Sequence, residues 1–445
     1  MPAPVHYAKS GDLNIAYQVT GKGPPDLIWS AGAYSHLDLQ AESPHFARMF
    51  DRLSERTRFI AFDKRGMGLS DRPDHVCTLE ERIDDIRAVL DAVGSREAYL
   101  VGFSEGGAIA ALFAATYPER VAGLILYGAP LAYGRRPDWP YGTTDEEFEA
   151  AWERARAANY EEDFTTESWR RWLGPALRDD AAFLEWFRRL RRAMGSPATR
   201  YQQARMNRLI DIRAILPSIR VPTLVMARED DPVAPLEMVR WAAARIPDAR
   251  LVVLPGQGHL MFDVWEDWIA AVEGFITGAA TQPVPSDRFL TTLVSADIVG
   301  STELIARVGD AQWRDVLARH YDLIGRRLVS YSGVEVDRAG DGFLARFDGP
   351  ARAIRFARDI DREDQALGIR ARAAVHTGEV EVSDGALRGM AVHIASRMTG
   401  LAGAGEVVVS GTVKDLVGGA GFNFVDRGIH TLKGVPEPRQ VFALA

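Results

Sequence analysis

The stretch LVGFSEGGAIAALFAATYP, residues 100–118, joins a short apolar run to a longer apolar segment through the pattern G-x-S-x-G. The run before the glycines has the length of a buried strand, and the segment after them has the length of a helix. Gly102 and Gly106 allow a cramped turn between the two, with the hydroxyl of Ser104 exposed at its tip. The stretch therefore predicts a strand–turn–helix unit that carries a candidate nucleophile, in preference to a glycine-rich turn with an incidental serine.

The same alternation of strands and helices extends outward on both sides, from about residue 13 to residue 275. The expected strands are DLIWS, RFIAFD, AYLVGFS, GLILYG, TLVMAR and RLVVLPG. Helical stretches between most of them favour a parallel sheet covered on both faces, which is an α/β fold. No good strand occurs between residues 132 and 217. We therefore expect a helical cap there, at about 133–216, within a first domain of residues 1–276.

A second domain is expected after TGAATQPVPSD, residues 277–287, whose small, polar and proline-containing composition is typical of a linker. Residues 288–445 begin with the strand FLTTLVSADIV, followed by helices around 301–330, a hairpin and a helix near 350–366. The strand RARAAVHTGEV, a helix at about 389–402 and the strand EVVVS come next. This β-α-β-β-α-β order predicts a ferredoxin-like α+β layer.

The composition is that of a globular protein of two domains, with 445 residues of which 47% are hydrophobic and 26% charged. A formal net charge of −8 argues against broad nucleic-acid binding, which requires a basic surface, but leaves room for a local nucleotide pocket. The single cysteine, Cys77, excludes an intramolecular disulfide and fits a reducing compartment. Because we find neither a signal-peptide pattern nor an apolar run of membrane-spanning length, we expect a cytoplasmic protein.

Candidate partners for Ser104 follow two later strands. TLVMAR runs into EDDPVAP, and LVVLP runs into GQGHLMF, so both segments leave the carboxyl ends of strands, where such a sheet presents its ligands. A nucleophilic serine needs a base, and the base needs an orienting carboxylate. We assign His259 as the base and Asp231 as the acid, with Asp230 as the alternative. His259 alone would be interpreted as a core residue, but the order Ser, Asp, His after these strands favours catalysis.

These motifs resemble the α/β-hydrolase family over about residues 10–275, and DKRGMGLSDR (63–72) is similar to a stretch that follows an early strand in that family. The resemblance implies an esterase or lipase with an oxyanion hole formed by the backbone N–H groups of Glu105 and Ala33. Where many members have His-Gly in that loop, this chain has Ala31 followed by glycine.

Aromatic residues are frequent in the expected cap. They could line an apolar acyl pocket, although aromatic residues at helical spacing are more often part of a core. The residues concerned are Trp139, Tyr141, Trp152, Trp169, Trp172 and Trp186.

Two acidic residues mark the second domain. Asp297 ends the strand in LVSADIVGST, and Asp341 occupies the turn of the hairpin VEVDRAGDGFLARF, residues 334–347. Aspartate is a common turn residue because its side chain can bond nearby backbone N–H groups. Two carboxylates on neighbouring strands also suit Mg²⁺ or Mn²⁺ together with phosphate oxygens. From these residues alone, Asp341 is either a turn residue or a metal ligand.

From about Arg288 onward the chain resembles class III nucleotidyl cyclases, with Arg397 in GMAVHIASRM and Lys433 in HTLKGVPEPRQVFAL as further matching positions. The resemblance implies two Mg²⁺ or Mn²⁺ ions on Asp297 and Asp341, and so favours the metal-ligand interpretation. It implies that Arg397 stabilises charge on the α-phosphate and that Lys433 contacts the terminal phosphates. It also implies a head-to-tail homodimer, with metals held by one chain and the arginine supplied by the other. The whole arrangement resembles bacterial α/β-hydrolase–cyclase fusions.

Three positions depart from the adenylyl cyclase pattern. Asp337 stands where a lysine usually reads adenine, and the position of that lysine's partner falls on about Ala386. An aspartate there is closer to the glutamate of guanylyl cyclases. His393 stands where an asparagine usually positions the ribose, and an imidazole can also donate a hydrogen bond. We therefore expect relaxed or weak base selectivity, with ATP ahead of GTP.

Three functions are compatible with the sequence. The leading hypothesis is a cyclase that converts ATP to 3′,5′-cyclic AMP and pyrophosphate and carries an N-terminal hydrolase domain, catalytic or regulatory. The second is a serine esterase or lipase whose cyclase domain is a degenerate nucleotide sensor. The third is a hydrolase fold that captures an apolar ligand and tunes the cyclase, because a fold alone does not establish a function.

Overall fold

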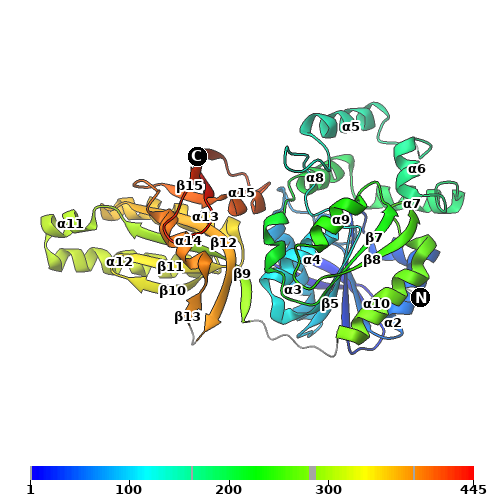
Figure 1. Cartoon of the computed structure of the whole chain (residues 1–445), viewed down its shortest axis with the longest axis horizontal. Helices are drawn as coiled ribbons and strands as arrows, with labels where there is room; N and C mark the ends of the chain where they lie inside the picture. The colour runs from blue at the N-terminus through cyan, green and yellow to red at the C-terminus, as the bar shows by residue number, and fades with distance from the viewer. Residues whose placement is uncertain (1–2, 162–163, 280–286, 384–385) are drawn as a thin grey trace. The chain divides into compact units, whose positions relative to one another are not determined.

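The computed structural model describes residues 3–161, 164–279, 287–383 and 386–445. The chain folds into two compact units, Met1–Ser286 and Asp287–Ala445 (Figure 1). Most of the expected linker, residues 280–286, lies outside the described residues. Within the described ranges, no helix combines the length and the apolar character needed to cross a membrane.

The first unit is built on a mixed sheet in the order β1-β2-β4-β3-β5-β6-β7-β8. Its strands are β1 (His6–Ser10), β2 (Leu13–Thr20), β3 (Asp26–Ser30), β4 (Arg58–Phe62), β5 (Ala98–Phe103), β6 (Val121–Tyr127), β7 (Thr223–Asp230) and β8 (Arg250–Gln257). The neighbours from β4 to β8 run parallel, as their continuous apolar runs predict.

The expected parallel sheet is extended at one edge by two antiparallel strands. There β1 and β2 form a hairpin around Gly11, and β2 pairs antiparallel with β4. The strand β1 has the sequence HYAKS, which lacks the apolar run by which the other strands were recognised, and it is only partly buried. The sequence thus predicts the six parallel strands, β3 to β8, and misses the two antiparallel strands at this edge.

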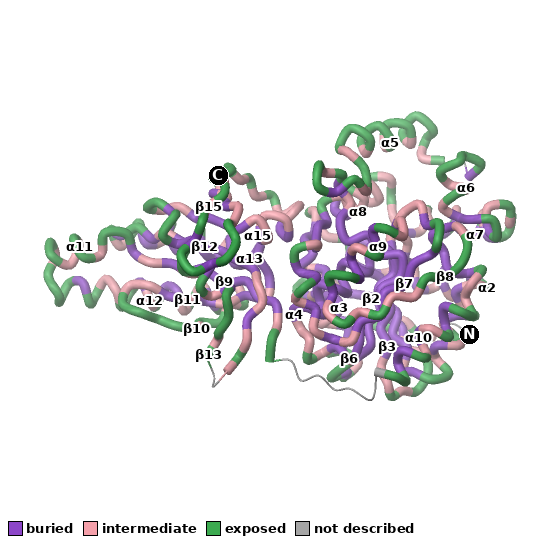
Figure 2. The backbone as a smooth tube through the Cα atoms, in the orientation of Figure 1, coloured by how far each residue is buried: buried purple, intermediate pink, exposed green. Residues whose placement is uncertain are grey.

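Helices cover both faces of this sheet, with α3 and α4 on one side and α2 and α10 on the other (Figure 1). The bounds are α1 (Leu37–Glu42), α2 (Pro44–Ser54), α3 (Leu79–Ala92), α4 (Glu105–Thr116), α9 (Leu236–Ala243) and α10 (Trp265–Ala279). Every residue of α4 is buried, because its glycines and alanines let it pack closely on β5, β6 and α3 (Figure 2). The nucleophile turn is therefore held at the centre of the unit.

Between β6 and β7 the chain forms helices that gather beyond one end of the sheet (Figure 1). They are α5 (Asp145–Ala157), α6 (Glu167–Leu173), α7 (Ala181–Ala193) and α8 (Pro197–Arg208). The amphipathic helix α7 buries Phe183, Trp186 and Phe187, and the Trp186 indole N–H donates to the carbonyl oxygen of Leu39 at 2.7 Å. The helices α6 and α7 are thereby packed onto the sheet and share its core.

The second unit has a mostly antiparallel sheet in the order β10-β11-β9-β12-β14-β16-β15, with β13 paired to β12. Its strands are β9 (Arg288–Ile298), β10 (Val334–Ala339), β11 (Gly342–Phe347), β12 (Ala371–Ser383), β13 (Ala386–Arg388), β14 (Val407–Ser410), β15 (Phe424–His430) and β16 (Arg439–Leu444). The four strands β10-β11-β9-β12 have the ferredoxin-like order, which confirms the predicted layer. The strands β13, β15 and β16 extend it beyond what was predicted.

Helices of the second unit divide between the two faces of its sheet. They are α11 (Ser301–Val308), α12 (Asp310–Ser330), α13 (Pro350–Asp364), α14 (Met390–Thr399) and α15 (Gly411–Leu416). Because side chains alternate along β9, Val294 and Ala296 face the core under α12 and α13, whereas Leu293 contacts the α14 side. Asp297 therefore lies on the face that α14 covers.

Replacing Phe356 by alanine should destabilise the second unit alone. Phe356 is fully buried on α13 against Phe343 and Phe347, at ring centroid distances of 5.8 and 5.0 Å. Loss of a buried phenylalanine costs about 3–5 kcal/mol. A two-transition thermal unfolding curve should show one midpoint lowered by roughly 10 °C and the other unchanged. The exposed Val329, as Val329→Ala, is the control, and a shift of both midpoints in Phe356→Ala would contradict separate cores.

Candidate functional sites

Ser104 lies at the tip of the turn between β5 and α4, in a conformation that non-glycine residues rarely adopt. Its φ is 52° and its ψ is −125°. Glycines make the turn possible: a Cβ on Gly32 would lie 2.9 Å from Cβ of Ser104, and one on Gly106 would lie 2.1 Å from the carbonyl oxygen of Ser30. The loop around Gly32 is therefore packed backbone to backbone on the nucleophile turn.

His259 and Asp231 form a buried pair after β8 and β7. Nδ1 of His259 lies 2.8 Å from Oδ2 of Asp231, and Oδ1 of Asp231 accepts hydrogen bonds from the backbone N–H groups of Val233 and Ala234. These bonds fix the carboxylate and, through it, the imidazole. Asp230, the alternative acid, is exposed and binds the Gln257 amide instead of the histidine.

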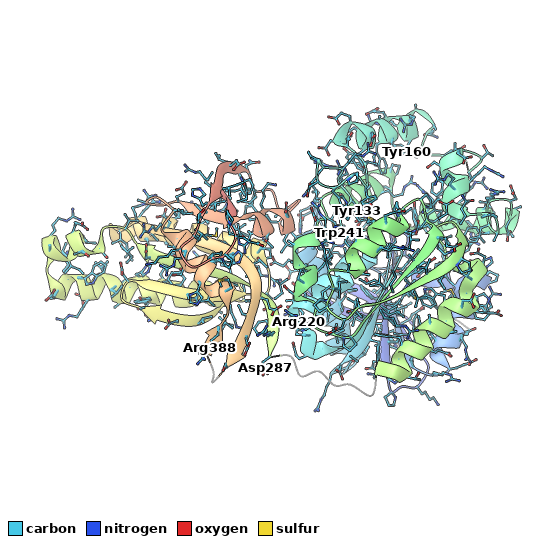
Figure 3. The ribbon with its side chains drawn as sticks, viewed as in Figure 1. Tyr133, Tyr160, Arg220, Trp241, Asp287 and Arg388 are labelled. Atoms are coloured by element: carbon cyan, nitrogen blue, oxygen red, sulfur yellow. The ribbon has the colours of Figure 1, made fainter. Side chains whose placement is uncertain are left out.

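The imidazole of His259 lies beside the nucleophile turn. The ring of Phe103, the residue before Ser104, stacks on it with centroids 5.1 Å apart. Among the described residues, Nε2 of His259 is buried and has no hydrogen-bond partner. Tyr133, labelled in Figure 3, lies within reach of the Ser104 side chain. Burial, followed by the charge of Glu105, raises the pKa of the Tyr133 phenol well above its usual value. A hydrogen bond with Ser104 acts in the opposite direction. Nε2 is thus the ring nitrogen that Asp231 does not engage.

The two expected oxyanion donors lie on the segments that meet at Ser104. Glu105 is the first residue of α4, so its backbone N–H has no acceptor within the helix. Ala33 follows Gly32 in the loop that packs on the turn. The N-terminus of α4 adds partial positive charge at the same place. Their use as donors remains a prediction, but both backbones are near the serine.

The side chain of Glu105 is the centre of a buried charged cluster that the sequence analysis did not foresee. Its carboxylate pairs with the Lys64 ammonium and with the Arg82 guanidinium, whose Nη2 lies 2.6 Å from Oε1. It also accepts a hydrogen bond from the Asn207 amide of α8. Nζ of Lys64 donates in addition to the carbonyl oxygen of Gly32 at 2.5 Å. Burial raises the pKa of Glu105, but the two cations outweigh burial and leave this pKa below its usual value.

Only part of the cap aromatic set lies near His259. The ring centroid of Trp172 is 5.9 Å from the imidazole, and the Trp172 carbonyl accepts from the His259 backbone N–H at 2.9 Å. Trp169 packs edge-on against Trp172. Trp139 is instead buried against Tyr141 and Trp241, and Trp152 packs on Phe148 and Tyr201. Trp186 belongs to the core of the first unit, and Trp169 and Trp172 pack against that core.

A pocket of about 340 Å³ in the second unit brings together three aspartates, Asp297, Asp337 and Asp341. Asp297 is near the end of β9, and Asp341 sits between β10 and β11. The register of β10 shifts between Glu335 and Asp337, and a β-bulge of this kind re-aims a side chain. Carboxylate oxygens converging on one pocket are a donor set that fits Mg²⁺ or Mn²⁺. Ala386, on β13, is not among the residues that line this pocket, so the expected base-reading pair is not brought together there.

The turn that contains Asp341 is held by another residue. The hydroxyl of Tyr321 donates to the carbonyl oxygen of Gly340 at 2.7 Å, and Gly340 supplies the positive φ of 65° that the turn requires. In the described part of the chain, the Asp341 carboxylate accepts no hydrogen bond from the backbone of its own turn. The structure therefore gives Asp341 no turn-stabilising role and leaves its carboxylate open to a ligand.

Arg372 is a site residue that the sequence analysis missed. It is the direct cross-strand partner of Asp297 in the β9–β12 pairing. Its Nε and Nη2 lie 2.6 and 3.0 Å from the two carboxylate oxygens of Asp297, and these bonds raise the pKa of the guanidinium. The position of the arginine could have been found only from the register of the two strands. A metal ion on Asp297 has to compete with this bidentate ion pair.

The other expected cyclase residues do not line this pocket. Val392, Ser396 and Thr399 are the α14 residues that line it. His393 and Arg397 are one turn apart on α14 and exposed, and Lys433 is exposed in the segment between β15 and β16. In the described residues none of these three side chains forms a hydrogen bond or ion pair. In a single chain, therefore, none of the expected phosphate- and ribose-binding side chains lines the acidic pocket.

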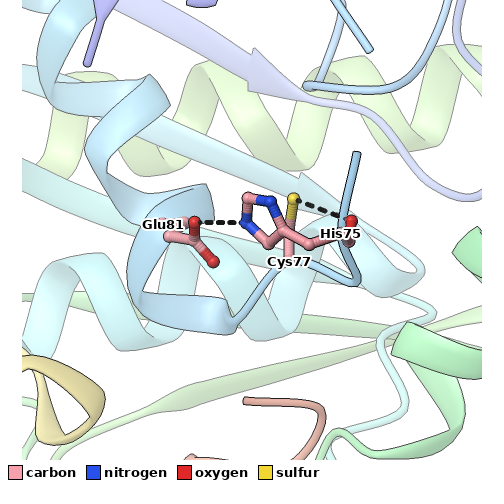
Figure 4. Close-up of side chains that lie close together, drawn as sticks. All are labelled: His75, Cys77 and Glu81. Carbon is pink, nitrogen blue, oxygen red and sulfur yellow. Dashed lines mark hydrogen bonds and ion pairs between the residues drawn. The ribbon is translucent and has the colours of Figure 1, made fainter. Parts of the chain in front are cut away.

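One further cluster of possible metal ligands lies near the start of α3. His75, Cys77 and Glu81 have ligand atoms within 4.8 Å of one another (Figure 4). Glu81 is already engaged, because it completes a capping box with Thr78 and accepts from Nε2 of His75 at 2.8 Å. Burial, followed by the charge of Glu81, raises the pKa of the Cys77 thiol to about 11, which disfavours the thiolate that a metal requires. The cluster is explained by helix capping.

Comparison with known proteins assigns each unit to a family. Residues 32–264 match the family described as alpha/beta hydrolase fold, and residues 290–445 match the family described as Adenylate and Guanylate cyclase catalytic domain. Both matches confirm the resemblances inferred from the sequence.

Relatives of the first unit include enzymes of known class. A pimeloyl-[acyl-carrier protein] methyl ester esterase of Nitrosomonas europaea is 30% identical over 254 residues, which cover 56% of this chain and 94% of the esterase. The structure of an esterase from Exiguobacterium antarcticum has a TM-score of 0.54 and 26% identity, covering 62% of this chain and 99% of that one. A hydrolase from Pseudomonas aeruginosa PA01 has a TM-score of 0.51 and 28% identity, covering 61% and 98%.

Replacing Arg372 by methionine should tighten Mn²⁺ binding to the second unit. The substitution removes the cation that competes for Asp297, and we expect an affinity gain of about fivefold or more, equivalent to about 1 kcal/mol at a partly exposed site. Electron paramagnetic resonance of free Mn²⁺ measures the dissociation constant. Arg370→Met is the matched control, because Arg370 pairs with Asp361 and is outside the pocket lining. Unchanged or weaker Mn²⁺ binding in Arg372→Met would contradict the competition.

Proposed function

We propose that this chain, which belongs to the α/β-hydrolase fold family and carries an adenylate and guanylate cyclase catalytic domain after that fold, has two reaction centres. The second unit forms a 3′,5′-cyclic nucleotide and pyrophosphate from a nucleoside triphosphate, with ATP preferred to GTP. The first unit hydrolyses an ester at Ser104. A nucleoside triphosphate substrate and a lone cysteine support a cytoplasmic location.

The separation of acidic and basic residues in the second unit is the observation that supports a two-chain cyclase site. Asp297 and Asp341 share one pocket, and α14 lines it with uncharged side chains while Arg397 is exposed outside it. A nucleoside triphosphate needs cations on both its metal side and its α-phosphate. Two copies of the chain, arranged head to tail, would bring Arg397 and Lys433 of one copy to the aspartates of the other.

In this arrangement each residue has a distinct task. Divalent ions bound at the two aspartates would neutralise the triphosphate and favour ionisation of the attacking 3′-hydroxyl. Asp297 and Asp341 hold that charge in place, and Arg372, once released from Asp297, is positioned to contact phosphate. From the second copy, Arg397 stabilises charge on the α-phosphate as pyrophosphate leaves.

The chain offers fewer suitable polar side chains for the ribose and the base than for the phosphates. His393 is one helical turn before Arg397, so both side chains can reach the same nucleotide, the ribose and the α-phosphate respectively. Asp337 lies among the metal-binding aspartates, and Ala386 offers no polar side chain. This arrangement supports a cyclase with weak base selectivity.

In the first unit the contacts support nucleophilic catalysis. Ser104 attacks the ester carbonyl, Nε2 of His259 takes the hydroxyl proton, and Asp231 holds Nδ1–H of the imidazole. The backbone N–H groups of Glu105 and Ala33 stabilise the oxyanion of the tetrahedral intermediate. The loop with Ala31 lacks the His-Gly pair of many family members, but the Lys64 ammonium anchors it through the Gly32 carbonyl. This contact favours a working oxyanion loop over a purely receptor-like role for this unit.

Two inactive cyclase variants should complement each other. Asp341→Ala and Arg397→Ala should each lose cyclic nucleotide formation from ATP with Mn²⁺, because each removes one half of every site. Mixed and re-equilibrated, they should recover about one quarter of wild-type turnover, since half of the random dimers then carry one intact site of two. The product is measured by chromatography. Mixtures that stay inactive, although mixed dimers are present, would contradict the two-chain site.

Ser104→Ala should abolish hydrolysis of a short p-nitrophenyl ester. Loss of the nucleophile lowers kcat by at least roughly 10³-fold in serine hydrolases. Asp230→Asn, which changes the exposed acid beside Asp231, is the control and should retain activity. Release of p-nitrophenol is followed by absorbance. An ester hydrolysis rate that is the same in Ser104→Ala and wild type would refute the serine mechanism.

A further inference from the structure

The buried cluster around Glu105 contains three charged side chains. Lys64, Arg82 and Glu105 have fully buried side chains, so two cations and one anion are withdrawn from water together. The polar Asn207 of α8 completes the cluster by donating to the carboxylate and accepting from Arg82. Buried charges persist only where each is paired and hydrogen-bonded, because desolvation is costly.

Lys64 is the member of the cluster that contacts both halves of the oxyanion site. Nζ donates to the carbonyl oxygen of Gly32, which immediately precedes Ala33, at 2.5 Å. The same ammonium pairs with the carboxylate of Glu105, whose own backbone N–H is the other proposed donor. One side chain thus joins the two segments that present the two N–H groups.

Among the described residues, Lys64 is the side chain that forms hydrogen bonds with both segments. Ala31 has no polar side-chain group. Gly32 and Gly106 have no side chains, and this allows the two segments to pack closely. A Cβ at Gly32 would meet Ser104, and one at Gly106 would meet the carbonyl oxygens of Ser30 and Ala31. The spacing of the two segments therefore depends on glycine contacts from one side and on Lys64 from the other.

We propose that Lys64 is a positioning residue for ester hydrolysis, which sets the spacing of the two oxyanion donors by holding the Gly32 carbonyl and the Glu105 carboxylate at once. The inference rests on the proposed serine hydrolase function. Lys64 contacts neither substrate nor the reacting atoms, and acts through the backbones of Ala33 and Glu105. Its net positive contribution behind the N–H groups also favours the developing negative charge.

The charge of Lys64 provides a signature that a purely structural residue lacks. Burial lowers the pKa of the Lys64 ammonium from 10.5 to about 8. The charges of Glu105 and Asp63 partly oppose this decrease, and the charge of Arg82 adds to it. These are the charged groups that face Nζ from α4, α3 and its own loop. Lys64 is charged below this pKa and neutral above it, so the link should weaken as the pH rises through about 8.

The test compares Lys64→Met and Lys64→Arg with wild type in p-nitrophenyl ester hydrolysis, from neutral to about pH 10. For wild type, kcat should fall as the pH rises through about 8 while KM changes little. Lys64→Met should have kcat lowered by roughly 10–100-fold at neutral pH, as expected for a small displacement of catalytic groups, and should lack this alkaline limb. Lys64→Arg keeps its charge throughout the range, so the activity it retains should not show the limb either.

Arg65→Met is the matched control. Arg65 is the next residue, and its buried guanidinium pairs with Asp85 and does not contact the Gly32 loop. The Arg65→Met variant should lower the thermal midpoint of the first unit, as Lys64→Met does. Its folded fraction should keep the wild-type pH profile of ester hydrolysis. If Lys64→Met does not fold, the wild-type profile and Lys64→Arg still decide the matter.

The outcomes separate this inference from the function on which it rests. Wild type that hydrolyses no ester, or an unchanged rate in Ser104→Ala, rejects the serine hydrolase itself. Hydrolysis that depends on Ser104 but shows the same kcat and the same alkaline limb in Lys64→Arg and wild type rejects the role of Lys64 alone. A rise in KM with unchanged kcat in Lys64→Met would also overturn it, because a donor-positioning residue acts on the transition state.

Discussion

The carboxylate of Glu105, buried between Lys64 and Arg82, is the interaction on which the site of the first unit depends. It lies at the start of α4, next to a serine held at positive φ, and the Glu105 side chain has no exposure to solvent. Removing one partner from a buried ion pair costs about 3–5 kcal/mol, because the remaining charge is left uncompensated. Four segments meet at this carboxylate: the loop with Lys64, α3, α4 and α8. The strained serine persists because the segments around it are fixed in this way.

The second unit uses charge differently. The exposed basic residues Arg397 and Lys433 do not line its acidic pocket, and among the described residues Asp297 pairs with Arg372 alone. Unpaired charges are tolerated because they remain in contact with solvent, in contrast to those around Glu105. In the proposed two-chain cyclase site, metal ions, nucleotide and a second copy would supply the missing partners. Under that proposal, one chain combines a preorganised centre with a centre that has to be assembled.

Much of the fold was predictable because its signals are local. The six parallel strands of the first sheet are short apolar runs bounded by turn residues, and Ser104, Asp231 and His259 follow such runs closely. The hairpin β1–β2 and the strands β15 and β16 lack such runs, so they were missed. The contact between Lys64 and Gly32 joins residues 32 positions apart in the sequence, and no periodicity predicts it. The pair Arg372–Asp297 depends on strand register, which the sequence pattern did not specify.

We propose that the ester site is complete in one chain whereas the cyclase site needs two. Both activities per chain, measured together with the molecular mass distribution across a dilution series of one preparation, test this difference. Cyclic nucleotide formation should follow the dimeric fraction, while Ser104-dependent ester hydrolysis per chain should stay constant. Cyclic nucleotide formation by a fraction that contains only single chains would contradict it.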